Sequence, residues 1–141
     1  LERRRPVRIP DFIREIRVPG RRPRELERDE GPLDRPGAPT MRAEHVVRYA
    51  DLDLNRHANN ASYVSWALEA LPLDVRESRW PAVMDIDFLA EAVLNDSLVS
   101  EAETAPAPAS DMGFIHRIAH ADGRELALLR SGWRRGGVGA G

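Results

Sequence analysis

The chain has 141 residues, with 21 basic and 23 acidic side chains, a formal net charge of −2 and no cysteine. This length suits one domain, and the lack of cysteine excludes a disulfide framework, a zinc knuckle and a thiol nucleophile. No apolar run approaches the roughly 18 residues of a membrane helix, and no secretory signal is evident, so we expect a cytoplasmic protein without a membrane span.

Residues 1–40 are rich in proline and arginine. They hold 7 of the 11 prolines and 11 of the 21 arginines, against 8 acids. Because proline lacks an amide donor and fixes φ, we predict a linker here, with one short helical turn at 10–16 as an alternative to a solvated chain. Acidic residues interrupt the basic ones and aromatic residues are scarce, so we expect no nucleic-acid binding.

The next segments show the periodicity of a strand and then of a helix. Alternation over 44–49 predicts a strand, with Val47 and Tyr49 on one side. The apolar spacing over 59–71 predicts an amphipathic helix, for which Asn59 or Asn60 is a suitable cap. This helix is the only long one that the pattern predicts.

Four more strands follow the predicted helix. Alternation predicts them over 84–90, 98–104, 112–120 and 125–133, and the Asp122-Gly123 pair predicts a hairpin turn between the last two. Glycine-rich residues 136–141 should form a disordered tail. We therefore predict an α+β domain over 41–135, in which an antiparallel sheet wraps around one long helix.

Polar residues are concentrated over 48–60, between the first strand and the helix. Seven of these thirteen positions are Asp, Asn, His or a partner arginine. One interpretation is turn and cap chemistry, in which Asp51 and Asp53 bind local amides and Asn55 is left-handed. The other is a reaction site, with Asp53, Asn55 and His57 converging near the amides of the helix N-terminus.

The run Arg48 to Tyr63, RYADLDLNRHANNASY, resembles the signature of the acyl-acyl-carrier-protein thioesterases, in their C-terminal hotdog domain. Asp87 to Ala92, DFLAEA, falls where that family carries a strand-borne catalytic glutamate. The resemblance implies a hotdog fold, an antiparallel sheet around a long helix. It also implies hydrolysis of acyl-acyl-carrier-protein thioesters, in which fatty acids are released from the acyl-phosphopantetheine of the carrier protein. The plant members carry a cysteine after this glutamate, whereas this chain has Ala92, so a thiol mechanism is impossible here.

Thioester hydrolysis needs a base for water and donors for the oxyanion. The resemblance therefore implies that Glu91 and His57 form the base pair, and that Asn55 binds the carbonyl or the water. Asp53 either holds Asn55 and the loop in place or acts directly as the base. Backbone amides from His57 to Asn59 should complete the oxyanion site.

Glu91 has a competing interpretation. By strand parity it shares a side with Asp85 and Asp87 and would be a solvated residue, unless a local bulge re-aims it.

Three further residues are assigned to substrate binding: Arg56, Asn59 and Asn60. Arg56, together with Arg76 and Arg79 beside the site, could meet the acidic surface or the phosphopantetheine phosphate of a carrier protein, although surface solubility explains these arginines equally well.

His116 and His120 share a strand face, but no third ligand of suitable spacing accompanies them, so we expect no metal ion or other cofactor. Trp66, Trp80 and Trp133 are expected in the core or an interface.

Two alternative functions are weighed beside the acyl-carrier-protein thioesterase. The first is an acyl-CoA thioesterase of the single-hotdog type with Asp53 as the sole catalytic carboxylate, and Asn55 argues against it. The second is a non-catalytic hotdog interaction domain. Because the family joins two hotdogs, we expect this chain to need a second one, either a missing N-terminal half or a homodimer partner.

Overall fold

The computed structural model describes residues 32–107 and 110–136. The predicted turn at 10–16, and the predicted tail apart from Gly136, lie outside the described residues. None of the helices in the described ranges has the length and apolar character needed to cross a bilayer.

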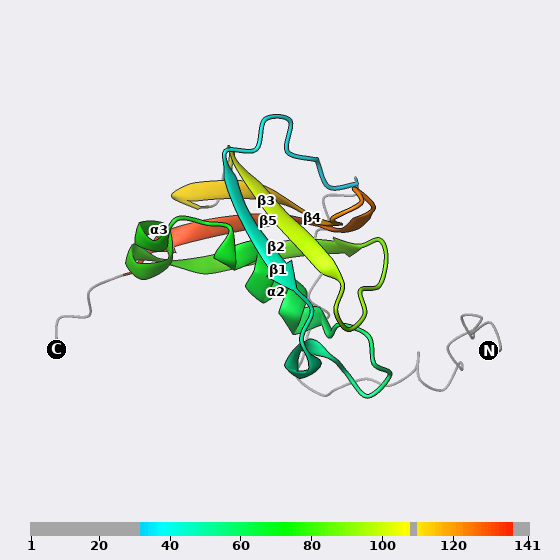
Figure 1. The fold of residues 1–141 in the computed structure, drawn as a ribbon. Coiled ribbons are helices and arrows are strands. Elements are labelled where there is room, and N and C mark those ends of the chain that lie inside the picture. Colours follow the sequence, from blue (N-terminus) through cyan, green and yellow to red (C-terminus); the bar gives the residue numbers. More distant parts are fainter. Residues whose placement is uncertain (1–31, 108–109, 137–141) are drawn as a thin grey trace, which may run out of the picture. The chain divides into compact units, whose positions relative to one another are not determined.

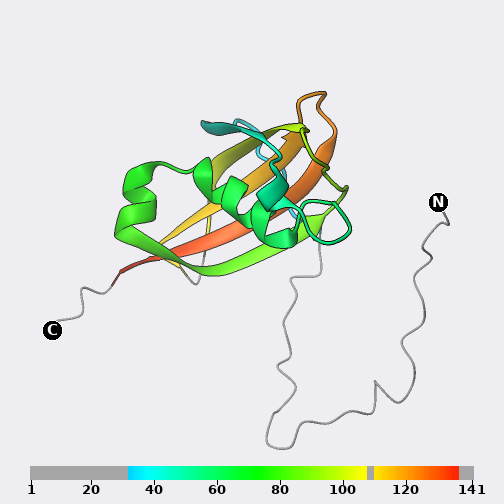
Figure 2. The same cartoon turned by 60° about the horizontal axis from the view of Figure 1, so that its bottom comes forward.

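One antiparallel sheet of five strands, in the order β1-β3-β4-β5-β2, forms the framework of the described domain. Figure 1 and Figure 2 show the helix α2 lying across one face of this sheet. The α+β hotdog architecture predicted from the sequence is therefore confirmed. The elements are β1 (Met41–Val46), a 3-10 turn η1 (Tyr49–Asp51), α2 (Asn60–Glu69), α3 (Leu73–Ser78), β2 (Arg79–Phe88), β3 (Ser97–Ala105), β4 (Met112–His120) and β5 (Glu125–Arg135).

The core lies between α2 and the inner face of the sheet. Tyr63, Trp66 and Ala67 are buried on α2, as the helical spacing predicted. They join a cluster that includes Leu98 on β3 and Leu129 on β5. Burying one large apolar side chain is worth about 1.5–3 kcal/mol, so this contact fixes α2 on the sheet.

The bounds of β3, β4 and β5 lie within two residues of the predicted ones. In β3 the alternation sets Leu98, Ser100 and Ala102 on one side, and these three residues are fully buried, whereas the intervening residues are partly exposed. The Asp-Gly turn joins β4 to β5, and Gly123 adopts a left-handed φ of 92°. Strand alternation and turn chemistry were therefore sufficient to predict this region.

Three details of the sequence prediction are wrong. The first strand covers 41–46 rather than 44–49, and Tyr49 lies exposed in η1. The short helix α3 was missed because it buries only Val75, which leaves no helical periodicity to detect. The alternation over 84–90 sets Phe88 on the same side as Met84 and Ile86, which is expected to face the core, but Phe88 is about half exposed because β2 ends there.

Residues 32–40 form no helix or strand, but hydrogen bonds attach them to the sheet. The Leu33 amide donates to Asp87 on β2, and Arg35 makes a bidentate ion pair with Glu125 on β5. Farther along, the amides of Gly37 and Ala38 both donate to one carboxylate oxygen of Glu103 on β3. This end of the predicted linker thus lies on the hotdog domain (Figure 1, cyan).

Two histidine–serine pairs are buried beneath α2. His116 Nε2 lies 2.8 Å from Ser131 Oγ, and His45 Nε2 lies 2.8 Å from Ser100 Oγ. Burial lowers the pKa of His116 from its ordinary value of 6.5 to about 4. The pKa of His45 is also lowered, by burial first. The core therefore holds its histidines in the neutral form.

We predict that His116 makes the domain acid-sensitive. Between pH 6.5 and 4 the unfolded state takes up a proton at this histidine and the folded state does not, so stability falls as the pH falls. Between pH 7 and pH 5, His116→Leu should lose about 2 kcal/mol less unfolding free energy than wild type, as measured by urea denaturation at each pH. Equal losses in the two proteins would contradict the prediction.

Candidate functional site

The loop before α2 is ordered largely by its own polar side chains. Asn59 caps α2, since its Oδ1 accepts from the Ser62 amide and its Nδ2 donates to the Asp51 carbonyl. Asp51 in turn accepts from the Arg48 amide. The cap predicted at Asn59 or Asn60 is therefore Asn59, and Asn60 is the exposed first residue of the helix.

Asp53 organises the tight turn that carries Asn55 and His57. Its Oδ1 accepts from the backbone amides of Asn55, at 2.7 Å, and of His57, at 3.2 Å. Desolvation would raise the pKa of Asp53, but the hydrogen bonds from the His57 and Asn55 amides outweigh it, and the pKa lies below its ordinary value. Asp53 is thus an ionised carboxylate that holds the loop.

The left-handed residue of this turn is Arg56, with φ of 64°, and not Asn55 as predicted. The Arg56 amide donates to the Asp53 carbonyl, and the Asp53 amide donates to the His57 carbonyl. These two bonds close the turn and require the positive φ at the residue before His57. The residue type offers little sign of this, because arginine does not favour the left-handed region.

Glu91 is re-aimed by a bulge at the end of β2. The amides of Leu89 and Ala90 both donate to the single carbonyl of Leu126, so two residues oppose one on β5. Beyond this bulge, Glu91 Oε2 lies 3.3 Å from His57 Nδ1. The structure therefore brings together the two side chains assigned to the base pair.

The backbone amides from His57 to Asn59 do not form the expected oxyanion site. They already donate to the Asp53 side chain, the Ala92 carbonyl and the Asp51 carbonyl respectively. The next two amides, of Asn60 and Ala61, lie in the first turn of α2 and have no hydrogen-bond acceptor among the described residues. The expectation was wrong because the loop uses its own amides to close on itself.

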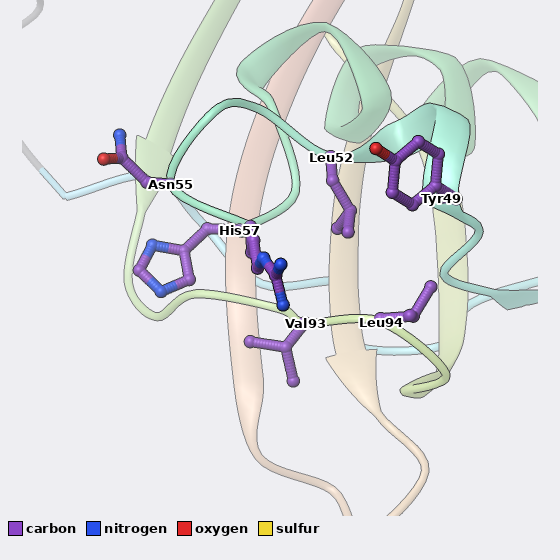
Figure 3. Close-up of a pocket in the computed structure, with 7 residues that line it drawn as sticks. Tyr49, Leu52, Asn55, His57, Val93 and Leu94 are labelled. Carbon is purple, nitrogen blue, oxygen red and sulfur yellow. The ribbon is translucent and has the colours of Figure 1, made fainter.

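An open pocket of about 470 Å³ adjoins this loop. Figure 3 shows Asn55 and His57 at one end of the pocket and apolar side chains at the other. Arg56 also lines it, and the apolar wall consists of Tyr49, Leu52, Val93 and Leu94. The sequence analysis did not predict these wall residues. A usable signal was the presence of apolar residues within the polar turn and shortly after Glu91.

The other candidates lie elsewhere or have structural partners. His116 is buried against Ser131, and His120 lies 3.2 Å from Asp122. In the part of the chain that the structure describes, no three histidine, cysteine, aspartate or glutamate residues are grouped to hold a metal ion.

Some of the arginines and tryptophans lie where the sequence predicted them, and others do not. Arg76 and Arg79, expected beside the site, lie in α3 and at the start of β2, past the opposite end of α2 (Figure 2). Trp66 and Trp133 are in the core, whereas Trp80 is about half exposed on the edge strand β2.

Solved structures with the same fold define the class of this domain. The 12:0-ACP thioesterase from Umbellularia californica matches with a TM-score of 0.68 and 23% identity, over 91% of this chain and 49% of that one. A thioesterase from Thermus thermophilus, complexed with coenzyme A and Zn, matches with a TM-score of 0.64 and 23% identity, over 72% of this chain and 88% of that one. The domain thus has the hotdog fold of thioesterases.

The sequence comparison then gives the family. Residues 36–135 match the acyl-ACP thioesterase C-terminal domain, and the chain belongs to this family. The chloroplastic palmitoyl-acyl carrier protein thioesterase of Cuphea hookeriana is 31% identical over 139 residues, covering 93% of this chain and 33% of the relative. The chloroplastic acyl-acyl-carrier-protein hydrolase FATB2 of Cuphea viscosissima is 32% identical over 105 residues, covering 72% and 25%. The chain spans between a quarter and a third of the length of these relatives.

We predict that the positive φ at Arg56 strains the site loop. A Cβ atom in this region costs about 1–2 kcal/mol, and glycine avoids that cost although it loses some entropy on folding. Arg56→Gly should therefore be about 1 kcal/mol more stable than Arg56→Ala, as measured by thermal or urea unfolding. Equal stability of the two variants would show that the loop relaxes out of this conformation.

Proposed function

We propose that this domain contributes the catalytic residues for hydrolysis of acyl-acyl-carrier-protein thioesters to free fatty acids, as the C-terminal part of a two-hotdog enzyme. The observation that carries the proposal is the contact of 3.3 Å between His57 and Glu91, within a domain of the acyl-ACP thioesterase family. Both side chains retain exposure to solvent, which an incoming thioester and a water molecule require.

In the proposed reaction, His57 acts as the general base. Its Nδ1 faces Glu91, which leaves Nε2 to take a proton from the attacking water, while the carboxylate stabilises the imidazolium. The water oxygen bonds to the carbonyl carbon, the C–S bond breaks, and the proton passes to the leaving sulfur. The products are a fatty acid and the free thiol of the carrier's pantetheine arm.

Two groups remain as candidates to stabilise the oxyanion. Asn55 lines the polar end of the pocket, although Figure 3 shows its amide turned away from His57 and its Nδ2 lies 3.5 Å from Asp53 Oδ2. The amides of Asn60 and Ala61 lie at the positive end of the α2 dipole. Asp53 is a positioning residue in this scheme, because its carboxylate accepts from the amides on both sides of Arg56.

Arg56 is proposed to contact the phosphate of the phosphopantetheine arm. It lines the pocket beside His57, and a guanidinium binds phosphate oxygens in a bidentate manner. The apolar wall opposite can cover the less polar part of the arm. Asn59 is a weaker candidate for substrate binding than the sequence suggested, because both polar atoms of its side chain are used in the cap.

The coenzyme A alternative assigns catalysis to Asp53 alone. That carboxylate accepts two backbone amides within its own loop, whereas His57 contacts Glu91. The geometry therefore favours the carrier-protein enzyme with a histidine–glutamate pair over a single catalytic aspartate.

Replacing either member of this pair should abolish most of the activity. We expect His57→Ala and Glu91→Ala each to lower kcat by about 100-fold or more on an acyl-acyl-carrier-protein substrate, because general-base catalysis is lost. Glu77→Gln, an exposed change on α3, is the control and should keep the wild-type rate.

Rates equal to wild type in both site variants would reject the assignment. Faster hydrolysis of acyl-CoA than of the carrier-protein thioester of the same chain length would favour the coenzyme A enzyme instead.

A second hotdog domain is the proposed partner. β2 is an edge strand that pairs only with β5 within the described sheet. Trp80 and Val83 on it, and Leu89 just past its end, are each 49% exposed. An exposed apolar edge of this kind usually pairs with another chain or domain. The greater length of the relatives supports a covalently linked partner, and a second copy of this chain can serve in its absence.

Light scattering tests this pairing on the chain as it stands. We expect about twice the monomer mass of 15.8 kDa, and Trp80→Asp with Val83→Asp should return the protein to monomer size, because the apolar edge is then charged. A wild-type protein that remains a folded monomer at high concentration would contradict the homodimer.

The cytoplasmic location stays a prediction, and both of the sequence relatives described above are chloroplast proteins.

A further inference from the structure

Tyr63 lies in the first turns of α2 and is almost completely buried, at 2% exposure. Its ring packs edge-on against Trp66 in the core and against Phe88 at the end of β2. A phenylalanine ring would make the same apolar contacts. The phenolic hydroxyl therefore needs a separate explanation.

That hydroxyl binds the backbone on both sides of Glu91. It donates to the carbonyl of Ala90, at 3.3 Å, and accepts from the amide of Ala92, at 3.0 Å. One side chain of α2 thus holds the two peptide groups that flank the proposed catalytic carboxylate.

Other bonds connect the same segment to the histidine loop. The Ala58 amide donates to the Ala92 carbonyl at 2.8 Å, and His57 pairs with Val93 in an isolated β-bridge. On the other side, the bulge at Leu89 and Ala90 binds the Leu126 carbonyl of β5. Glu91 is therefore the exposed residue of a segment whose backbone is fixed before and after it.

Only a protonated hydroxyl can donate to Ala90 while accepting from Ala92. Burial raises the pKa of Tyr63 above its ordinary value of 10, and the nearby carboxylates of Glu91 and Asp96 act in the same direction, although the hydrogen bond from the Ala92 amide opposes them. The hydroxyl therefore keeps its proton at neutral pH.

We infer that Tyr63 is a positioning residue for catalysis, whose hydroxyl aims Glu91 at His57 by binding the peptide groups of Ala90 and Ala92. This inference rests on the function proposed above. Glu91 is an exposed side chain, so its approach to the imidazole depends on its backbone, and a displacement of about 1 Å can cost up to about 100-fold in rate.

The test compares Tyr63→Phe with Ser131→Ala. Each change removes a buried hydroxyl that has two hydrogen-bond partners, but Ser131 contacts His116 and Trp133 and none of the residues from 89 to 92. Tyr63→Phe should lower kcat by about tenfold with little change in KM, whereas Ser131→Ala should lose stability and keep the kcat of wild type.

A double-mutant cycle separates positioning from a general structural effect. If Tyr63 acts through Glu91, Tyr63→Phe should cause no further loss of kcat in a Glu91→Ala background. Independent, additive losses would overturn the inference, as would a kcat for Tyr63→Phe equal to that of Ser131→Ala.

A structural measurement keeps this test apart from the proposed function. If wild type hydrolyses no acyl thioester, the proposed function fails, and the positioning is then judged by NMR. Tyr63→Phe should speed hydrogen exchange of the Ala92 amide and weaken the nuclear Overhauser contact between the His57 ring and the Glu91 side chain. Unchanged exchange and an unchanged contact would refute the role of the hydroxyl.

Discussion

The burial of one face of α2 against the sheet determines where the proposed catalytic residues, His57 and Glu91, lie. Asn59, directly before this helix, caps it and holds the histidine loop, and Tyr63 within the helix holds the segment of Glu91. The buried aromatic and apolar residues of α2 pack against β3, β4 and β5 and so hold the histidine loop and the Glu91 segment against the same sheet. The distance between His57 and Glu91 is therefore set by packing about the helix and does not depend on either loop alone.

Most polar residues of the site loop support the structure before any chemistry begins. Asp51, Asp53 and Asn59 bind backbone groups of this exposed turn and so fix its conformation. The structure thus confirms turn and cap chemistry as one explanation for the density of Asp and Asn, and the catalytic explanation is the proposal made above. A closed, well-bonded loop is what allows His57 to face outward beside an exposed carboxylate.

Periodicity predicted the helix and β3, because burial alternates along β3 and follows the helical repeat on α2. The β4–β5 hairpin was predicted from its specific Asp-Gly turn, although most residues of β5 are buried. The orientation of Glu91 followed from neither parity nor propensity. It depends on the bulge at Leu89 and Ala90, which is a tertiary contact with Leu126. The sequence also could not predict that the amides of Ala58 and Asn59 already have acceptors, because those acceptors, the carbonyls of Ala92 and Asp51, lie on other segments of the folded chain.

Ala92, the residue after Glu91, is held more tightly than its small size suggests. Its amide and carbonyl are both bonded, and its methyl group is completely buried in the cluster beneath α2. A side chain at this position consequently points inward, away from solvent. A cysteine in place of Ala92 would be packed in the core in this geometry, and its sulfur would be shielded from alkylating reagents in the folded protein.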